Sequence, residues 1–161
     1  MYTRPDYPSH AELMAARDRV LAQHPNLRFI GAHLASLEYD VDLLAATLDR
    51  YPNLAVDTSA RLFDLVVQDS ANVRAFITKY QDRILFGTDV VMRTRPSSLP
   101  PGERALVLAS LRSVYITHFA YFESKGMVTV REREVQGLGL PQSVLEKLYR
   151  TNAERWYPGL K

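Results

Sequence analysis

Three short apolar runs, each followed by a segment with helical spacing, constrain the fold of this chain more than any other feature. The runs begin near residues 28, 54 and 83, and each has the length of a β-strand. They are apolar on both faces, which is typical of strands buried between helices in a parallel sheet. The sequence therefore predicts an α/β fold, either a doubly wound sheet or part of a (β/α)8 barrel. Because no glycine-rich phosphate loop follows any run, the dinucleotide-binding form of the doubly wound sheet is disfavoured.

Helix signals precede and separate these runs. Ser9 and Glu12 fit a capping box at the start of the first helix, which is expected to end at His24 before a proline. A later helix is expected to begin at Ser70, a residue type that caps helices. The positions expected to face inward are Leu13, Ala16, Val20 and Leu21 in the first helix, Leu37, Val41, Leu44 and Leu48 in the second, and Val73, Phe76, Ile77 and Tyr80 in the third.

The pattern changes after Asp89. Residues 93–102 form a basic, proline-rich loop, and a long helical segment is expected from about Glu103 to Glu123. Residues 125–136 include the β-prone stretch MVTV, which predicts a short excursion in β structure. A last helix is expected to open near Pro141. The side chains of this helix that are expected to pack inward are Val144, Leu148 and Tyr149.

Composition places the chain among ordinary globular proteins. Of its 161 residues, 47% are hydrophobic and 24% are charged, which suits a single domain over residues 1–161. A net charge of +2 is too small to indicate a nucleic-acid partner, and the absence of cysteine excludes thiolate metal sites. The N-terminal MYTRPDYPSH lacks the apolar core of a signal peptide, and no window approaches the roughly 18 apolar residues of a membrane span. We therefore expect a cytoplasmic protein with no membrane partner.

Residues capable of chemistry follow all three apolar runs. His33 ends the first run, Asp57 ends the second with Arg61 shortly after it, and Asp89 follows the third in the sequence GTD. Functional side chains of parallel βα folds lie where the strands end, at the open rim. Imidazole and carboxylate bind divalent metals or move protons, and arginine can hold an anionic substrate by a two-pronged contact. The pattern predicts a polar site at one edge of the sheet.

Each of these residues also has a purely structural interpretation. A histidine at a strand end can be a core residue with a satisfied ring, and the GTD at Asp89 can start a turn and cap the next helix. Asp57 can be a satisfied loop carboxylate, while Arg93 and Arg95 fit solvated charges in a loop. Taken one at a time, the residues leave the structural and the catalytic interpretations open.

Three stretches taken together are more specific. They read RFIGAHLASLEYDVDLLAATLDRYPNLAVDTSAR, VRAFITKYQDRILFGTD and GLGLPQSVLEKLYRTNAERWYPG, in this order along the chain. Over nearly its whole length the chain resembles the amidohydrolase-related family of the metal-dependent hydrolase superfamily, the group that contains aminocarboxymuconate-semialdehyde decarboxylase-like enzymes. The resemblance implies a partial (β/α)8 TIM barrel, in which the three runs correspond to the sixth, seventh and eighth strands.

The resemblance also implies a reaction. It places Asp89 as a metal ligand or as the acceptor of a proton from metal-bound water, and His33 in contact with that water or with the substrate. Zinc, the usual metal, lowers the pKa of bound water toward neutrality. The implied function is a metal-dependent hydrolase acting on a small molecule. Apart from the resemblance, Arg61, or the loop with Arg93 and Arg95, is a candidate to hold a substrate carboxylate. Non-oxidative decarboxylation, also found in this family, is the alternative.

Parts of the family pattern are missing. The His-x-His pair of the first strand and the histidine of the fifth are absent, which leaves the zinc site incomplete because a catalytic zinc takes about three protein ligands. His10 and His24 are expected at the two ends of a helix, away from the rim. Three parallel strands also leave open edges, which a second copy, a complementing chain or rearranged C-terminal helices must cover. An inactive or complementing barrel fragment is therefore a further alternative.

Overall fold

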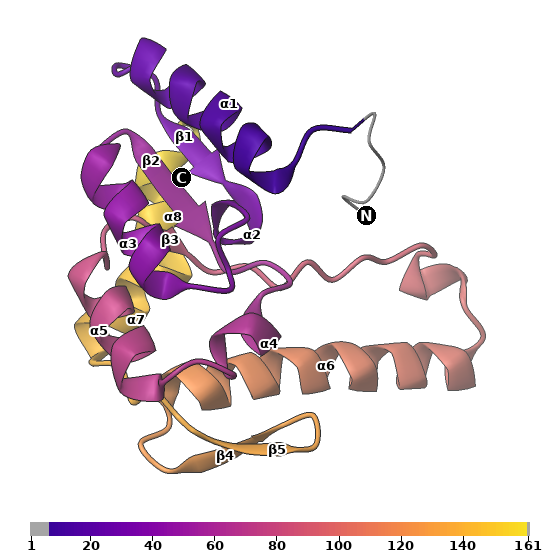
Figure 1. The fold of residues 1–161 in the computed structure, drawn as a ribbon. Helices are drawn as coiled ribbons and strands as arrows, with labels where there is room; N and C mark the ends of the chain where they lie inside the picture. Colours follow the sequence, from indigo (N-terminus) through magenta and orange to yellow (C-terminus); the bar gives the residue numbers. More distant parts are fainter. Residues whose placement is uncertain (1–6, 161) are drawn as a thin grey trace.

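A three-stranded parallel sheet forms the centre of the structure (Figure 1). The computed structural model describes residues 7–160, so most of the N-terminal segment that lacks a signal-peptide core lies outside the described residues. In spatial order the strands are β1 (Phe29–Gly31), β2 (Leu54–Asp57) and β3 (Ile84–Leu85). Pairing is parallel, with Ile30 opposite Ala55. The predicted parallel sheet with helices between its strands is confirmed.

Helices connect the strands, and short-range signals set several of their ends. The Ser9 hydroxyl accepts a hydrogen bond from the Glu12 N–H (3.2 Å) while the Glu12 carboxylate accepts one from the Ser9 N–H (2.7 Å), which confirms the capping box. The predicted cap at Ser70 is wrong by one residue, because Asp69 accepts from the Asn72 N–H at 2.8 Å. The helices are α1 (His10–Gln23), α2 (Ala32–Ala35), α3 (Val41–Arg50), α4 (Leu62–Leu65), α5 (Ser70–Lys79), η1 (Pro96–Ser98), α6 (Pro101–Glu123), α7 (Gln142–Glu146), η2 (Lys147–Thr151) and α8 (Asn152–Trp156).

Helices cover both faces of the sheet. Side chains alternate in direction along a strand, so Leu54 and Val56 face one side while Ala55 faces the other. Leu54 and Val56 belong to the main core, which also contains the buried faces of α3 and α5. Ala55 packs in a second cluster with Leu85 of β3 and Trp156 of α8, and Figure 1 shows α8 behind the sheet. The result is a mixed α/β fold built around a small sheet.

Helix α1 is less buried than its sequence predicts. Leu21 is only 2% exposed, whereas Leu13 and Val20, expected on the same inward face, are 39% and 45% exposed. Periodic spacing identifies an apolar stripe, but burial also requires an element that covers it. Figure 1 shows α1 at the periphery, beside the edge strand β1. In contrast, the inward positions expected in α3 and α5 are confirmed, and they include Leu44, Leu48, Val73 and Ile77.

Helix α6 extends away from the rest of the fold (Figure 1). It is long and apolar enough to cross a membrane by length and composition, with a mean hydropathy of 1.3 in a window of which 17% is buried. This corrects the expectation that no window approaches a membrane span. Leu106 and Ile116 are 74% and 54% exposed on its surface. Core helices and signal sequences share this length and composition, so these two features do not assign α6 to a membrane.

A β-hairpin follows α6. Its strands β4 (Met127–Val130) and β5 (Arg133–Gln136) pair antiparallel, with Val130 opposite Arg133, so the turn consists of Arg131 and Glu132. The β excursion expected from the MVTV stretch is confirmed. Val130 is buried in the main core, which attaches the hairpin to the body of the protein.

Candidate functional site

The chain leaves β1 through a left-handed turn. Four consecutive residues have a positive φ, from 53° to 61°, and they are His33, Leu34, Ala35 and Ser36. Each non-glycine residue in this conformation costs roughly 1–2 kcal/mol, so the conformation persists only where the surroundings impose it. The first predicted strand, expected to continue to His33, is therefore too long, because β1 ends at Gly31. An apolar run shows that a segment is buried but does not reveal its backbone conformation.

Side chains from α1 and β2 hold this turn in place. The carboxylate of Asp57 accepts a hydrogen bond from the His33 N–H (3.1 Å). Arg17 donates to the Ala35 carbonyl (2.7 Å), and Nε2 of His10 lies 3.0 Å from the Ser36 carbonyl. The prediction that His10 lies away from the rim is therefore wrong. Sequence spacing gave no signal for His10 or Arg17, because both contacts join residues at least 18 positions apart.

The ring of His33 is oriented by the end of β2. Its Nδ1 lies 2.8 Å from the Ser59 carbonyl, and because a carbonyl only accepts, Nδ1 carries the proton of this bond. In the neutral imidazole the lone pair then lies on Nε2. Asp57 supports the same arrangement, since its Oδ1 accepts from the Ser59 N–H (3.0 Å) as well as from His33. Half-buried His33 is thus fixed in tautomer and direction.

Hydrogen bonds also join the residues that follow β2 and β3. The Thr58 hydroxyl accepts from the Gly87 N–H and donates to the Gly87 carbonyl, both at 3.1 Å. A Cβ at Gly87 would lie 2.1 Å from the Ser59 hydroxyl, so any larger residue here would force that hydroxyl to move. The predicted convergence of strand ends is confirmed for this network, which joins His33 to Asp57 and Ser59 and joins Thr58 to Gly87.

Asp89 lies two residues after Gly87 in the sequence. It is exposed, has a φ of 58°, and forms no hydrogen bond or ion pair with another residue in the part of the chain that the structure describes. Neither Asp89 nor His33 lines the hollows described for residues 7–160. Strand order places them at the same edge of the sheet, at the ends of β3 and β1 with β2 between them. Their catalytic roles stay predictions.

The charge of Arg61 is balanced within the protein. Its guanidinium lies 3.5 Å from a Glu38 carboxylate oxygen and 3.8 Å from an oxygen of Asp64, and 29% of the side chain is exposed. Contact with a substrate carboxylate through Arg61 stays a prediction, and such a ligand would compete with these two acids. Arg93 and Arg95 are exposed in the loop before α6.

The described residues do not make a complete metal site. Within residues 7–160, no group of three or more histidine, cysteine, aspartate and glutamate side chains comes together to hold a metal ion. A catalytic zinc takes about three protein ligands. His118 of α6 does not add to the strand-end site, because it is buried and its Nδ1 lies 2.7 Å from the Val114 carbonyl of its own helix.

These features define an α/β protein whose polar groups gather where the strands of a parallel sheet end. A family model described as amidohydrolase matches residues 2–159, and the chain belongs to this amidohydrolase family. No curated protein and no solved structure matches the chain. The expected family is confirmed at this level, whereas membership of the decarboxylase-like group stays a prediction.

The left-handed backbone of this turn leads us to predict that glycine in it would stabilise the protein. Exposed Ser36 has a φ of 61°, so Ser36→Gly removes a steric cost, and we expect the free energy of unfolding to rise by about 0.5–1 kcal/mol. Ser110→Gly is the matched control, because Ser110 is exposed within the right-handed helix α6, and it should lose about 0.5–1 kcal/mol. Urea unfolding measures both changes. An equal loss of stability in the two variants would show that the turn is not left-handed.

Proposed function

We propose that this chain is part of a hydrolase that acts on a small molecule at the carboxyl ends of its strands. The observation that carries the proposal is the orientation of His33, whose Nδ1–H is occupied by Ser59 so that Nε2 is available to a ligand. Family membership over residues 2–159 supports a hydrolase-type reaction. In this proposal His33 orients the attacking water or the substrate through Nε2, and Asp89 accepts a proton.

The family usually binds divalent metals, and zinc is the metal that we expect from the resemblance. Since the described residues bring together fewer than three suitable side chains, a metal would need further donors from outside this group. The reaction that we propose for this chain therefore contains no step at a metal ion. The contribution of this chain is the fixed tautomer of His33, the backbone network that supports it, and an exposed carboxylate at Asp89.

A complementing fragment is the second candidate. It is supported by the incomplete donor set and by the sheet order, in which β1 and β3 each pair with only one strand among the described residues. Open edges of parallel strands favour pairing with another chain. In this version the chain forms the last part of a (β/α)8 barrel, and a second copy or a separate chain supplies the remaining strands. The parent reaction would be hydrolysis, or decarboxylation of a small acid as in the decarboxylase-like group.

The test is turnover of ester, lactone and amide substrates, and of small carboxylic acids, by the purified chain with added zinc and after chelation. We expect His33→Asn and Asp89→Asn to lower turnover by about 100-fold or more, as for the loss of a group that moves a proton. His24→Asn is the matched control, because His24 is an exposed histidine after α1 and should leave turnover unchanged.

A second experiment distinguishes a chain that is active alone from a complementing fragment. The assays are repeated after co-expression with a chain that carries the His-x-His part of a family barrel. Turnover only in the mixture supports the complementing fragment. Absence of turnover in both arms, or equal turnover in His33→Asn and the unmodified chain, contradicts the hydrolase proposal.

A further inference from the structure

Residues 90–116 form an arm that projects from the body of the protein. The arm consists of the loop after Asp89, η1 and most of α6, and Figure 1 shows it extending away from the sheet. Arg104 of α6 donates to the Leu99 carbonyl (3.2 Å), and residues 90–94 line one hollow together with α6, so the loop and the helix form one unit. None of the described side chains of the arm is buried, because the buried residues of α6 begin at His118.

The arm exposes large apolar side chains on more than one side. Val91, Leu106 and Leu108 are 73%, 74% and 49% exposed. Leu106 and Leu108 are two positions apart in α6 and therefore point to nearly opposite sides of the helix. A helix that is apolar all round belongs in a protein core or in lipid. Only 17% of the apolar window of α6 is buried, which excludes a core helix, and its start at Pro101 excludes a signal sequence.

The charges of the arm are mostly positive. It contains four arginines and a single acidic residue, Glu103. Arg93, Arg95 and Arg112 are exposed, and within residues 7–160 none of them pairs with a carboxylate. These like charges oppose contact between the arms of two copies, whereas the surface of an anionic phospholipid membrane attracts them. Arginine also keeps its charged group in water while its stem lies against apolar groups, so the arginines are compatible with apolar contact.

The length of the free part of α6 limits how the arm can contact lipid. A helix needs about 20 apolar residues to cross a bilayer. The part of α6 before His118 is shorter than this, and the end of the helix is held in the protein by the buried side chains of Tyr121 and Phe122. The arm can therefore lie in the interface of a membrane but cannot span it.

We propose that residues 90–116 dock this protein on the surface of anionic phospholipid membranes. The apolar side chains of the arm enter the boundary between headgroups and acyl chains, and its arginines lie at the lipid phosphates. The affinity of such a contact grows with the apolar area buried and with the attraction to anionic lipid. This proposal differs from the expectation, drawn from the sequence, of a protein with no membrane partner. It does not rest on the proposed hydrolase function, because binding to lipid needs no turnover.

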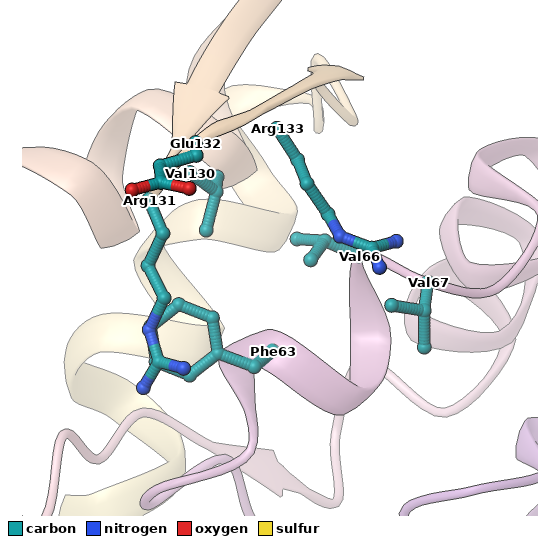
Figure 2. Close-up of a pocket in the computed structure, with 7 residues that line it drawn as sticks. All are labelled: Phe63, Val66, Val67, Val130, Arg131, Glu132 and Arg133. Atoms are coloured by element: carbon teal, nitrogen blue, oxygen red, sulfur yellow. The ribbon is translucent and has the colours of Figure 1, made fainter.

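The experiment is co-sedimentation of the full chain with vesicles of phosphatidylcholine alone and with vesicles that contain about one third phosphatidylserine. Binding to the anionic vesicles should be at least about tenfold tighter, and it should weaken as added salt screens the arginines. The double variant Arg93→Gln with Arg95→Gln should lose most of this preference. Arg131→Gln with Arg133→Gln is the matched control and should keep it, since both arginines are exposed on the hairpin and line the hollow in Figure 2, outside the arm.

A second pair of variants tests the apolar contact. Leu106→Glu should weaken binding to the anionic vesicles by about tenfold or more, because it removes an apolar side chain from the lipid and adds a negative charge. Val67→Glu makes the same change of charge at another exposed apolar side chain, which is 60% exposed and lines the hollow in Figure 2. This control should lose no more than about twofold, since Val67 lies outside the arm.

Light scattering without lipid measures whether copies of the chain associate through the arm. Equal binding to neutral and anionic vesicles, no sedimentation with either, or equal losses in Leu106→Glu and Val67→Glu would overturn the proposal. An oligomer that forms without lipid and is dissociated by Leu106→Glu would assign the arm to contact between copies, and it would overturn the proposal as well.

Discussion

Trp156→Ala is expected to lower the free energy of unfolding by about 3–5 kcal/mol, the largest loss of stability that we expect from a single substitution in this protein. Trp156 is 7% exposed and packs against Ala55 and Leu85 on the second face of the sheet. Its indole N–H also donates to the Asp82 carbonyl at 3.0 Å. Truncation removes the side chain that covers this face and leaves a cavity, and it frees a carbonyl that loses its partner.

The adjacent Tyr157 provides the control. It is 45% exposed, so Tyr157→Ala should change the free energy of unfolding by no more than about 0.5 kcal/mol. Urea unfolding followed by circular dichroism measures both variants without relying on tryptophan fluorescence. Since small domains are stable by about 5–15 kcal/mol, the loss at Trp156 is a large fraction of the total. Equal stabilities of the two variants would contradict the arrangement of α8 against the sheet.

Asp57→Ala should have the second largest effect, a loss of about 2–3 kcal/mol. One oxygen of Asp57 accepts from two backbone N–H groups, those of His33 and Ser59. Without it both donors are left without their acceptor, and the left-handed turn loses a contact that holds it. We expect smaller damage in Asp57→Asn, about 1 kcal/mol, because its amide carbonyl still accepts although the charge is lost.

Asp64→Ala is the matched control for Asp57. Its carboxylate is 38% exposed, and its ion pair with Arg61 is long, at 3.8 Å, so removal should cost no more than about 0.5–1 kcal/mol. Unfolding in urea gives the energies, and the NMR signals of the His33 ring report whether its orientation survives. An Asp57→Ala variant as stable as Asp64→Ala, with unchanged His33 signals, would show that Asp57 does not support the turn.

Local sequence signals predict much of this fold. Apolar runs near residues 28, 54 and 83 locate β1, β2 and β3, and the Ser9 capping box locates the start of α1. These signals succeed because helix caps and periodicity act over a few residues. They fail at α1, whose apolar stripe is mostly uncovered, and at the end of β1, where four residues adopt left-handed backbone.

For the candidate site, the sequence by itself determined the positions where chemistry can occur. His33, Asp57 and Asp89 follow three apolar runs, and a parallel sheet brings its strand ends to a common edge. Only the tertiary structure decided how these residues are held. The Asp57 carboxylate, the Ser59 carbonyl and the α1 side chains reach the His33 turn from distant segments. The physical reason is that hydrogen bonds and cavities depend on distances in space, which a pattern of neighbouring residues does not encode.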